Sequence, residues 1–347
     1  MPKASIIIPT FNRCSMLGRA VESAFRSGGD AEVIIIDDAS IDETPRVCQS
    51  FPQAKVIRLQ KNVGLAGARN AGIEQATGDY IVLLDDDDVR LPDSLPSQIQ
   101  QLESHRDAAF CYGKVIIGDN QTCEPTADSM PGELPVGDLF WKLLRSNFIP
   151  AVSTVIRKTA LQTIGSFDPS LRQVEDWDLW LRLSERSSVQ AVPEPVAIYR
   201  AFLPNSEQLS SNRARMARAA AAVQKKAMRL PRARHDVSRA RCIRAGFVGE
   251  LRFGLLIDSV EALLGGHKRQ AVDALHTLLR IFPVTLFRSA EFRALLKLAH
   301  SKSDCLARPQ QKQLKSIRKH LWDTISEHIP VDDVSNAPTA EKGGMKN

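Results

Sequence analysis

The sequence has few of the residues that build metal clusters and disulfide frameworks. Only six of its 347 residues are cysteine, and no two of them form a Cys-x-x-Cys pair. Closely spaced cysteines are typical of zinc sites, and a high cysteine content is typical of small secreted proteins held together by disulfides. The scattered cysteines therefore argue against both classes and are consistent with a reducing cytoplasm.

Long hydrophobic runs are also missing. A membrane-spanning helix needs about 18 consecutive apolar residues, and the best candidate, residues 251–264, is interrupted by Arg252, Asp258 and Glu261. The apolar stretch at residues 4–9 is too short for the core of a signal peptide. We therefore expect a cytoplasmic protein that is not integral to a membrane, although it could be peripheral at the inner face of the cell membrane.

The commonest nucleotide-binding motifs are absent as well. The sequence has neither a Gly-x-Gly-x-x-Gly fingerprint nor a Walker motif, which disfavours Rossmann dehydrogenases and P-loop enzymes. Instead, residues 62–72 place small residues and glycine just before Arg69, on the first turns of an expected helix. Small residues let a backbone approach a phosphate that Arg69 can neutralise. Close packing of the helix on a strand explains the glycines equally well.

Charge is distributed unevenly along the chain. Residues 1–205 carry 20 basic and 27 acidic side chains, whereas residues 206–347 carry 26 basic and 13 acidic ones. Opposite net charges in two parts of one chain indicate two different tasks. We predict a first domain at residues 1–205, a basic helical region at 206–330 and a disordered polar tail at 331–347.

Strand and helix patterns alternate near the start of the chain. Short apolar runs at residues 5–8, 32–36, 55–59 and 80–84 are separated by stretches with helical periodicity. This alternation predicts an α/β fold with a mostly parallel sheet that helices cover on both faces. Ligands bind beyond the carboxyl ends of the strands in such sheets, so residues that directly follow a strand are the first candidates for a site.

Two of these strands run directly into acidic residues. Asp37 and Asp38 follow the second strand, and four consecutive aspartates at 85–88 follow the fourth. Adjacent carboxylates repel one another unless a cation is present, and oxygen ligands suit Mg²⁺ or Mn²⁺. An acidic residue after the second strand commonly accepts hydrogen bonds from a nucleoside. The alternatives are a helix cap at 37–38 and a solvated loop at 85–88. We expect both clusters at the same edge of the sheet.

A third acidic feature is the pair Glu175 and Asp176. The sequence predicts a helix over residues 176–185, and a carboxylate at a helix N-terminus has a lowered pKa because of the helix dipole. An ionised Asp176 would suit a general base. An acidic first turn that only stabilises the helix is the alternative.

These segments together resemble family 2 glycosyltransferases. The resemblance covers about residues 3–205, and its motifs agree with the family in order and spacing. The motifs are S-I-I-I-P-T-F-N at 5–12, I-D-D-A-S-I-D-E-T at 36–44, N-V-G-L-A-G-A-R-N at 62–70, L-D-D-D-D at 84–88 and E-D-W-D-L-W-L-R at 175–182. The resemblance implies the GT-A fold, a Rossmann-like mixed sheet flanked by helices, here followed by the helical C-terminal region.

The resemblance also implies roles for individual residues. Asp176 would be the catalytic base, and Asp85 and Asp87 would form a DxD motif that binds Mn²⁺ or Mg²⁺, with Asp87 the more direct ligand. The residues implied to bind the nucleotide-sugar are Asp38 at the base, Thr10 and Asn12 in the same pocket, Asp86 at the ribose and Arg69 at the nucleotide. Members of the family usually invert the anomeric centre in a single displacement.

One position departs from the family pattern. Many relatives have a histidine two residues after the Tyr-Arg pair found here at 199–200, whereas this sequence has Phe202. If that histidine serves the metal or the diphosphate in relatives, this protein acts without it. His105 is the only histidine before residue 235, so the sequence offers no obvious substitute.

Basic residues are concentrated at 213–244. This segment has eleven Lys or Arg and a single acidic residue, Asp236. It lacks interleaved aromatic residues and any recognisable nucleic-acid-binding module, so we do not expect a nucleic acid as partner. A solvated helix face and an anionic membrane surface are the remaining interpretations. The second fits an enzyme whose acceptor is linked to a lipid.

The expected function is transfer of a sugar from a nucleotide-diphospho-sugar, preferably a UDP-sugar, to a hydroxyl of a glycan or lipid-linked acceptor. Cell-surface polysaccharide or glycoconjugate biosynthesis is the expected setting. One alternative is a sugar-nucleotide nucleotidyltransferase, which usually has a Gly-rich basic loop after the first strand, where this sequence reads Pro-Thr-Phe-Asn-Arg at 9–13. The other alternative is a non-catalytic nucleotide-sugar-binding protein on the same fold.

Overall fold

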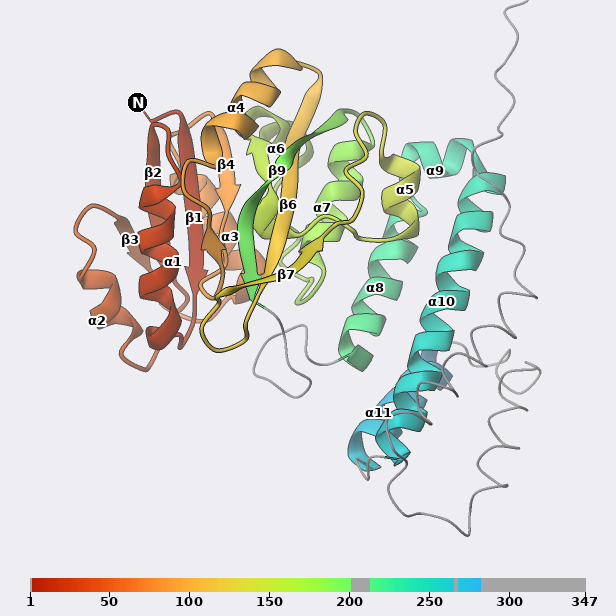
Figure 1. The fold of residues 1–347 in the computed structure, drawn as a ribbon. Helices are drawn as coiled ribbons and strands as arrows, with labels where there is room; N and C mark the ends of the chain where they lie inside the picture. The colour runs from red at the N-terminus through yellow and green to blue at the C-terminus, as the bar shows by residue number, and fades with distance from the viewer. Residues whose placement is uncertain (1, 201–212, 265–267, 282–347) are drawn as a thin grey trace, which may run out of the picture. The chain divides into compact units, whose positions relative to one another are not determined.

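The computed structural model describes residues 2–200, 213–264 and 268–281 (Figure 1). Of these residues, those up to Leu251 belong to one compact unit and those from Arg252 onward to a second. The predicted tail at 331–347 and Phe202 lie outside the described residues. The first unit extends beyond the predicted boundary at residue 205, while the division of tasks at that boundary stays a prediction.

The first unit is built on a mixed sheet, which in the described residues has nine strands in the order β3-β2-β1-β4-β8-β6-β9-β5, with β7 paired to β6. Strands β1 to β4 are mutually parallel, and β8 joins β4 in the antiparallel sense. The strands are β1 Ala4–Thr10, β2 Ala31–Asp37, β3 Lys55–Arg58, β4 Tyr80–Leu83, β5 Val89–Arg90, β6 Ala108–Gly118, β7 Pro125–Met130, β8 Val155–Arg157 and β9 Ser188–Arg200. The predicted α/β architecture is therefore confirmed.

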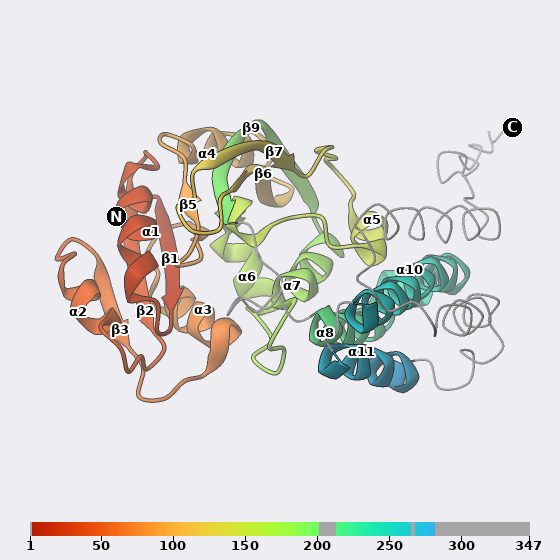
Figure 2. The ribbon, with the colours of Figure 1, turned by 60° about the horizontal axis from the view of Figure 1, so that its bottom comes forward.

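Helices lie on both faces of this sheet (Figures 1 and 2). The helices of the first part are α1 Cys14–Arg26, α2 Thr44–Gln49, α3 Gly64–Gln75, α4 Leu95–Ser104, α5 Phe140–Arg145, α6 Lys158–Ile164 and α7 Glu175–Ser184, with a short 3₁₀ turn at Ala151–Ser153. The basic region supplies α8 Arg213–Ala227, α9 Pro231–His235, α10 Val237–Leu264 and α11 Lys268–Ile281. None of the helices in the described ranges is long and apolar enough to cross a membrane.

Alternating side chains of the central strands fill two separate cores. In β1, Ile6 and Ile8 pack in one core with residues of α1 and α4, whereas Ile7 packs in the other with residues of α3 and α7. This is the period-two pattern of a strand that is covered on both faces. The continuous apolar strands seen in the sequence follow from this double burial.

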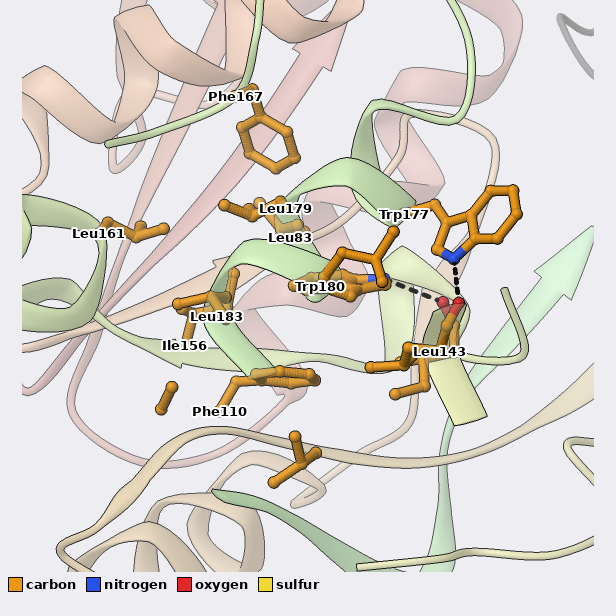
Figure 3. Packing of buried hydrophobic residues seen from close by; sticks show 14 of the residues in the cluster. Leu83, Phe110, Leu143, Ile156, Leu161, Phe167, Trp177, Leu179, Trp180 and Leu183 are labelled. Carbon is orange, nitrogen blue, oxygen red and sulfur yellow. Dashed lines mark hydrogen bonds between the residues drawn. The ribbon is translucent and has the colours of Figure 1, made fainter. Parts of the chain in front are cut away.

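The core that contains Ile7 fixes helix α7, which carries the predicted base. Trp180 is stacked on Phe110 of β6, with ring centroids 4.8 Å apart (Figure 3). The indole N–H of Trp177 donates to the carbonyl of Leu143 at 2.6 Å, and that of Trp180 donates to the carbonyl of Ile149 at 3.3 Å. Buried tryptophans with satisfied N–H groups hold a helix in one orientation. The position of α7 is therefore set by the core.

Strand β9 corrects one expectation from the sequence. The prolines at 193 and 195 predict two short strands, at 189–192 and 196–199, but the structure has the single strand β9. Its pairing with β6 shifts register between Tyr112 and Lys114, which oppose Ala191 and Pro195. The register also shifts between Lys114 and Val115, so the pairing of Pro195 lies between two irregularities of the ladder, where a missing donor is tolerated. Strand β9 therefore continues to Arg200.

Candidate active site

The acidic strand ends meet at one edge of the sheet, as predicted. Strands β2 and β4 flank β1 and run parallel to it, so their carboxyl ends lie at the same edge. Thr10 at the end of β1 is in register with Asp37 at the end of β2, and both side chains are buried. This edge gathers the predicted residues at positions 10–12, 37–38 and 85–88.

Asp38 closes the N-terminus of α3. Its two carboxylate oxygens accept hydrogen bonds from the backbone N–H groups of Val63 and Gly64, at 2.7 and 2.9 Å. Burial raises the pKa of Asp38, and the two amide donors oppose this rise. The sequence suggested a cap for the helix that follows Asp38 directly, but the helix that Asp38 stabilises begins 26 residues later. Its contact with a nucleotide base stays a prediction.

The loop after β1 is tied to the loop after β2 through Asn12. Asn12 has a left-handed backbone with φ of 53°, its side-chain oxygen accepts from the N–H of Ile41 at 2.9 Å, and its own N–H donates to the Ser40 hydroxyl at 3.0 Å. Asp37 accepts from the N–H of Ser40 at 2.8 Å. Asparagine tolerates positive φ better than most residues. These bonds hold the predicted nucleoside pocket in shape.

The aspartates after β4 are compensated by two buried arginines. Arg69 of α3 donates to an Asp85 oxygen at 2.6 Å, and Arg200 of β9 donates to Asp87 at 2.5 and 3.2 Å. The backbone N–H of Arg200 donates to Asp88 at 2.8 Å. Two guanidinium groups thus reduce the carboxylate repulsion at this turn. Arg200 is a site residue that the sequence analysis missed; its position at the end of an apolar strand is the signal that could have identified it.

Burial keeps part of this cluster near its protonated form. Burial, assisted by the charge of Asp87, raises the pKa of Asp86 to about 7. Burial also raises the pKa of Asp88, and the charges of Asp87 and Asp85 act in the same direction. A carboxyl group that is buried among like charges favours its neutral form until a cation arrives. Added positive charge at this turn would favour the ionised form of these carboxylates.

A metal ion would find suitable donors here but no prearranged cage. Among the described residues, no three His, Cys, Asp or Glu side chains gather closely enough to form a metal site. Asp85 and Asp87 do offer carboxylate oxygens, the donor type that Mg²⁺ and Mn²⁺ prefer. Their side chains are 28% and 15% exposed, so solvent reaches both. The donor set fits a divalent cation that also takes ligands from water and phosphate.

Arg69 connects the acidic turn to α7. Its side chain is only 2% exposed, and its second terminal nitrogen donates to Glu175 at 2.6 Å. Burial raises the pKa of Glu175 to about 7 even though Arg69 favours the ionised form. Both terminal nitrogens of Arg69 are thus engaged by carboxylates. The predicted contact between Arg69 and a nucleotide stays a prediction. Glu175 as a partner of Arg69 was not foreseen from the sequence.

Asp176 lies at the start of α7, next to this ion-pair network. One carboxylate oxygen accepts from the N–H of Trp177 at 2.7 Å, and the other accepts from the side chain of Asn147 at 3.2 Å. The expectation of a lowered pKa was wrong: burial raises the pKa of Asp176, and this outweighs the lowering effect of Arg69 and the hydrogen bonds. Asn147 had no signal in the sequence. The role of Asp176 as a base stays a prediction.

Comparisons with known proteins identify the family. The model described as glycosyl transferase family 2 matches residues 5–165. The uncharacterized glycosyltransferase YwdF of Bacillus subtilis (strain 168) is 32% identical over 202 residues, which are 57% of this chain and 74% of that protein. The chain belongs to glycosyltransferase family 2. This confirms the resemblance carried by the five motifs and disfavours a nucleotidyltransferase.

Other relatives of this family 2 glycosyltransferase match it over a smaller part of their length. An uncharacterized glycosyltransferase of Haemophilus influenzae is 31% identical over 189 residues, which are 53% of this chain and 63% of that protein. The succinoglycan biosynthesis protein ExoO of Rhizobium meliloti is 37% identical over 107 residues, which are 30% and 31% of the two chains. The chain spans less than two thirds of the length of both relatives.

Solved structures confirm the fold of this family 2 glycosyltransferase. Residues 1–349 of TarS from S. aureus, in complex with UDP-GlcNAc, share the fold with a TM-score of 0.58 at 17% identity, over 86% of this chain and 88% of that one. The mannosyltransferase PcManGT from Pyrobaculum calidifontis, in complex with GDP-Man and Mn²⁺, gives a TM-score of 0.53 at 15% identity, over 96% and 88%. The predicted GT-A type of fold is therefore confirmed.

Proposed function

We propose that this family 2 glycosyltransferase transfers a sugar, with inversion, from a nucleotide-diphospho-sugar to a hydroxyl acceptor in polysaccharide or glycoconjugate assembly. The observation that carries the proposal is that one buried arginine, Arg69, binds both Asp85 of the acidic turn and Glu175, which directly precedes Asp176 at the start of α7. The nucleotide-sugars bound by TarS and PcManGT support this kind of donor. The similarity to ExoO supports the setting.

The proposed reaction needs a base and a stabilised leaving group. Asp176 takes the proton of the acceptor hydroxyl, whose oxygen forms a bond to the anomeric carbon. The bond from that carbon to the diphosphate oxygen breaks, and its electron pair leaves with the diphosphate. One base and one displacement give inversion, whereas a retaining double displacement requires a second nucleophile.

The acidic turn serves the diphosphate in this proposal. Asp85 and Asp87 would hold a divalent cation, which when bound supplies positive charge to the leaving diphosphate. Arg200 contributes a fixed positive charge at the same turn. Asp38 binds the base and Asp86 faces the ribose, and Thr10 and Asn12 line the base pocket.

A donor screen tests the proposal. The protein is incubated with a panel of UDP-, GDP- and dTDP-sugars with Mn²⁺, and release of the nucleoside diphosphate is measured beside binding by calorimetry. We expect binding and slow hydrolysis of one class of donor. A non-catalytic protein would bind a donor without any turnover. A nucleotidyltransferase would instead release pyrophosphate from a nucleoside triphosphate and a sugar phosphate.

Replacing Asp38 tests the proposed base pocket. In Asp38→Ala we expect the Kd for the nucleoside diphosphate to rise about 10-fold, the cost of one good hydrogen bond to a charged group, while kcat at saturating donor changes little. The variant also loses the cap of α3. The matched control is therefore Asp42→Ala, which removes an acceptor of the Thr44 N–H nearby and should leave the Kd unchanged. An unchanged Kd in Asp38→Ala would contradict the assignment.

We further propose that the basic region attaches the enzyme to an anionic membrane surface. Some of its cations are used internally: Lys226 pairs with Asp168 and Asp178 at 2.7 and 2.8 Å, and Arg232 pairs with Asp138. Other basic side chains of the region are exposed, namely Lys225, Arg229, Arg234 and Arg241. Each basic residue near an anionic surface contributes about 1 kcal/mol. Even a few would give reversible attachment.

Vesicle sedimentation tests this attachment. We expect the protein to co-sediment with phosphatidylserine-containing vesicles at low salt and to be released by high salt, because screening shortens to about 8 Å at physiological ionic strength. Charge reversal of Lys225, Arg229 and Arg241 should abolish sedimentation. The control reverses three exposed arginines outside the region, Arg26, Arg46 and Arg106. Absence of binding by the wild type at low salt would show that the basic face is only solvated.

A further inference from the structure

The side chain of Arg69 is placed as a bridge between two segments that are far apart in the sequence. One terminal nitrogen binds Asp85, 16 residues away, and the other binds Glu175, 106 residues away, each at 2.6 Å. The side chains of Arg69 and Glu175 are almost fully buried, at 2% and 6% exposure. A planar guanidinium holds two carboxylates in a fixed fork geometry, whereas an ammonium is a point charge with rotatable donors.

Neighbouring contacts hold this bridge in one position. The Arg69 guanidinium lies over the ring of Phe167, 5.3 Å from its centroid. The adjacent Asn70 donates to the backbone carbonyl of Phe167 and accepts from its N–H, both at 2.9 Å. The N-terminus of α3 is held separately by Asp38. The helix that carries Arg69 is thus anchored at both ends of its first two turns.

The backbone just before Glu175 is strained. Val174 has a φ of 52°, in the left-handed region, and a β-branched residue there is a true outlier. Such strain persists only where surrounding contacts over-determine the conformation. The next residue, Glu175, forms a buried ion pair with Arg69. This ion pair is placed to hold the start of α7 in the strained form.

We propose that Arg69 and Glu175 are positioning residues that set the base Asp176 at a fixed place relative to the acidic turn at Asp85. The inference rests on the proposed glycosyl transfer and assigns Arg69 a task other than nucleotide contact. Asp176 and Asp85 belong to opposite partners of the reaction, the acceptor and the donor. A displacement of about 1 Å between reacting groups can cost about 100-fold in rate, so a rigid link between the two has a direct catalytic effect.

A positioning role of Arg69 and a direct contact with the nucleotide predict different effects of substitution on kcat and on nucleotide affinity. In Arg69→Lys, which keeps the charge but not the fork, we expect kcat to fall at least about 10-fold with the Kd for the nucleoside diphosphate within about twofold. Glu175→Gln should show the same pattern. In the double variant the loss should not exceed that of the worse single variant, because both break one link.

The control is Asp178→Asn, on the same helix. Asp178 is equally buried and pairs with Arg182 and Lys226 at 2.8 Å each, so its substitution lowers Tm but should leave kcat within twofold of the wild type. A rise in nucleotide Kd that matches the loss of kcat/KM in Arg69→Lys would overturn the proposal in favour of direct contact. An unchanged kcat in Glu175→Gln, or losses that multiply in the double variant, would also overturn it.

Amide hydrogen exchange tests the link without any turnover. Arg69→Lys should accelerate exchange both at Asp88, whose N–H is bonded to the Asp85 carbonyl, and at Asp178, whose N–H is bonded to the Val174 carbonyl. Asp178→Asn should accelerate exchange in α7 alone. If the wild type turns over no donor but this pattern is found, the proposed function fails and the link stands. If exchange in Arg69→Lys changes at only one of the two places, the link is refuted.

Discussion

Asp176→Asn is expected to lower kcat by about 10²-fold or more, the usual contribution of a general base. The substitution keeps the shape of the side chain and an acceptor for the Trp177 N–H, but it removes the group that takes the proton. The nucleotide Kd should stay near that of the wild type, because the base acts on the acceptor. The measurement is steady-state release of nucleoside diphosphate at saturating donor, compared with Asp178→Asn.

The pH dependence of the wild type gives an independent check. The base works only when ionised, and burial raises the pKa of Asp176. The ionised fraction, and with it kcat, should therefore be lost as pH falls through a pKa above the ordinary aspartate value of about 3.9. A kcat that stays constant down to pH 4, or an unchanged kcat in Asp176→Asn, would contradict the assignment.

Removal of the divalent cation is the second large effect expected. Chelation with EDTA should lower turnover by about 10²–10³-fold, equivalent to the several kcal/mol that a metal supplies to a developing charge, and Mn²⁺ or Mg²⁺ should restore it. Asp87→Asn should resemble the chelated enzyme because it removes a charged ligand. In Asp87→Asn, Mn²⁺ binding should be weaker than in the wild type, as measured by paramagnetic resonance in the presence of a nucleoside diphosphate.

The contacts of the acidic turn sharpen this prediction. Arg200 is paired with Asp87 at 2.5 Å, so a cation must share or replace that contact, and we expect weak binding of Mn²⁺ alone. Asp93→Asn is a suitable control, since Asp93 lies beyond β5 and takes part in no predicted ligand set. Full activity of the metal-free enzyme would refute the metal requirement. An Mn²⁺ affinity of Asp87→Asn equal to that of the wild type would show that the metal binds elsewhere.

The part of the fold that a local pattern encodes could be predicted from the sequence. Strands β1, β2 and β4 are apolar runs because helices cover both faces, and the aspartates at the ends of β2 and β4 stand out for that reason. Parallel pairing then places Asp38 and residues 85–88 at one edge. This step needs only the rule that carboxyl ends of parallel strands lie together.

The contacts that build the site could not be predicted in this way. Arg69 and Glu175 are 106 residues apart, and Arg200 and Asp87 are 113 apart, so no local periodicity joins them. The pKa of Asp176 was misjudged because the helix dipole is visible in a sequence, whereas the burial that outweighs it arises only on folding. The long strand β9 likewise depends on its partner β6 rather than on its own prolines.

The configuration of the released sugar tests the proposed single displacement at the anomeric carbon. Slow hydrolysis of an α-linked donor by the wild-type enzyme can be followed by proton NMR, which distinguishes the anomers of the released sugar before they equilibrate in water. We expect the β-anomer to appear first, together with the nucleoside diphosphate, and Asp176→Asn to release neither at a comparable rate. Release of the α-anomer first, or hydrolysis at the wild-type rate by Asp176→Asn, would contradict a single displacement assisted by this carboxylate.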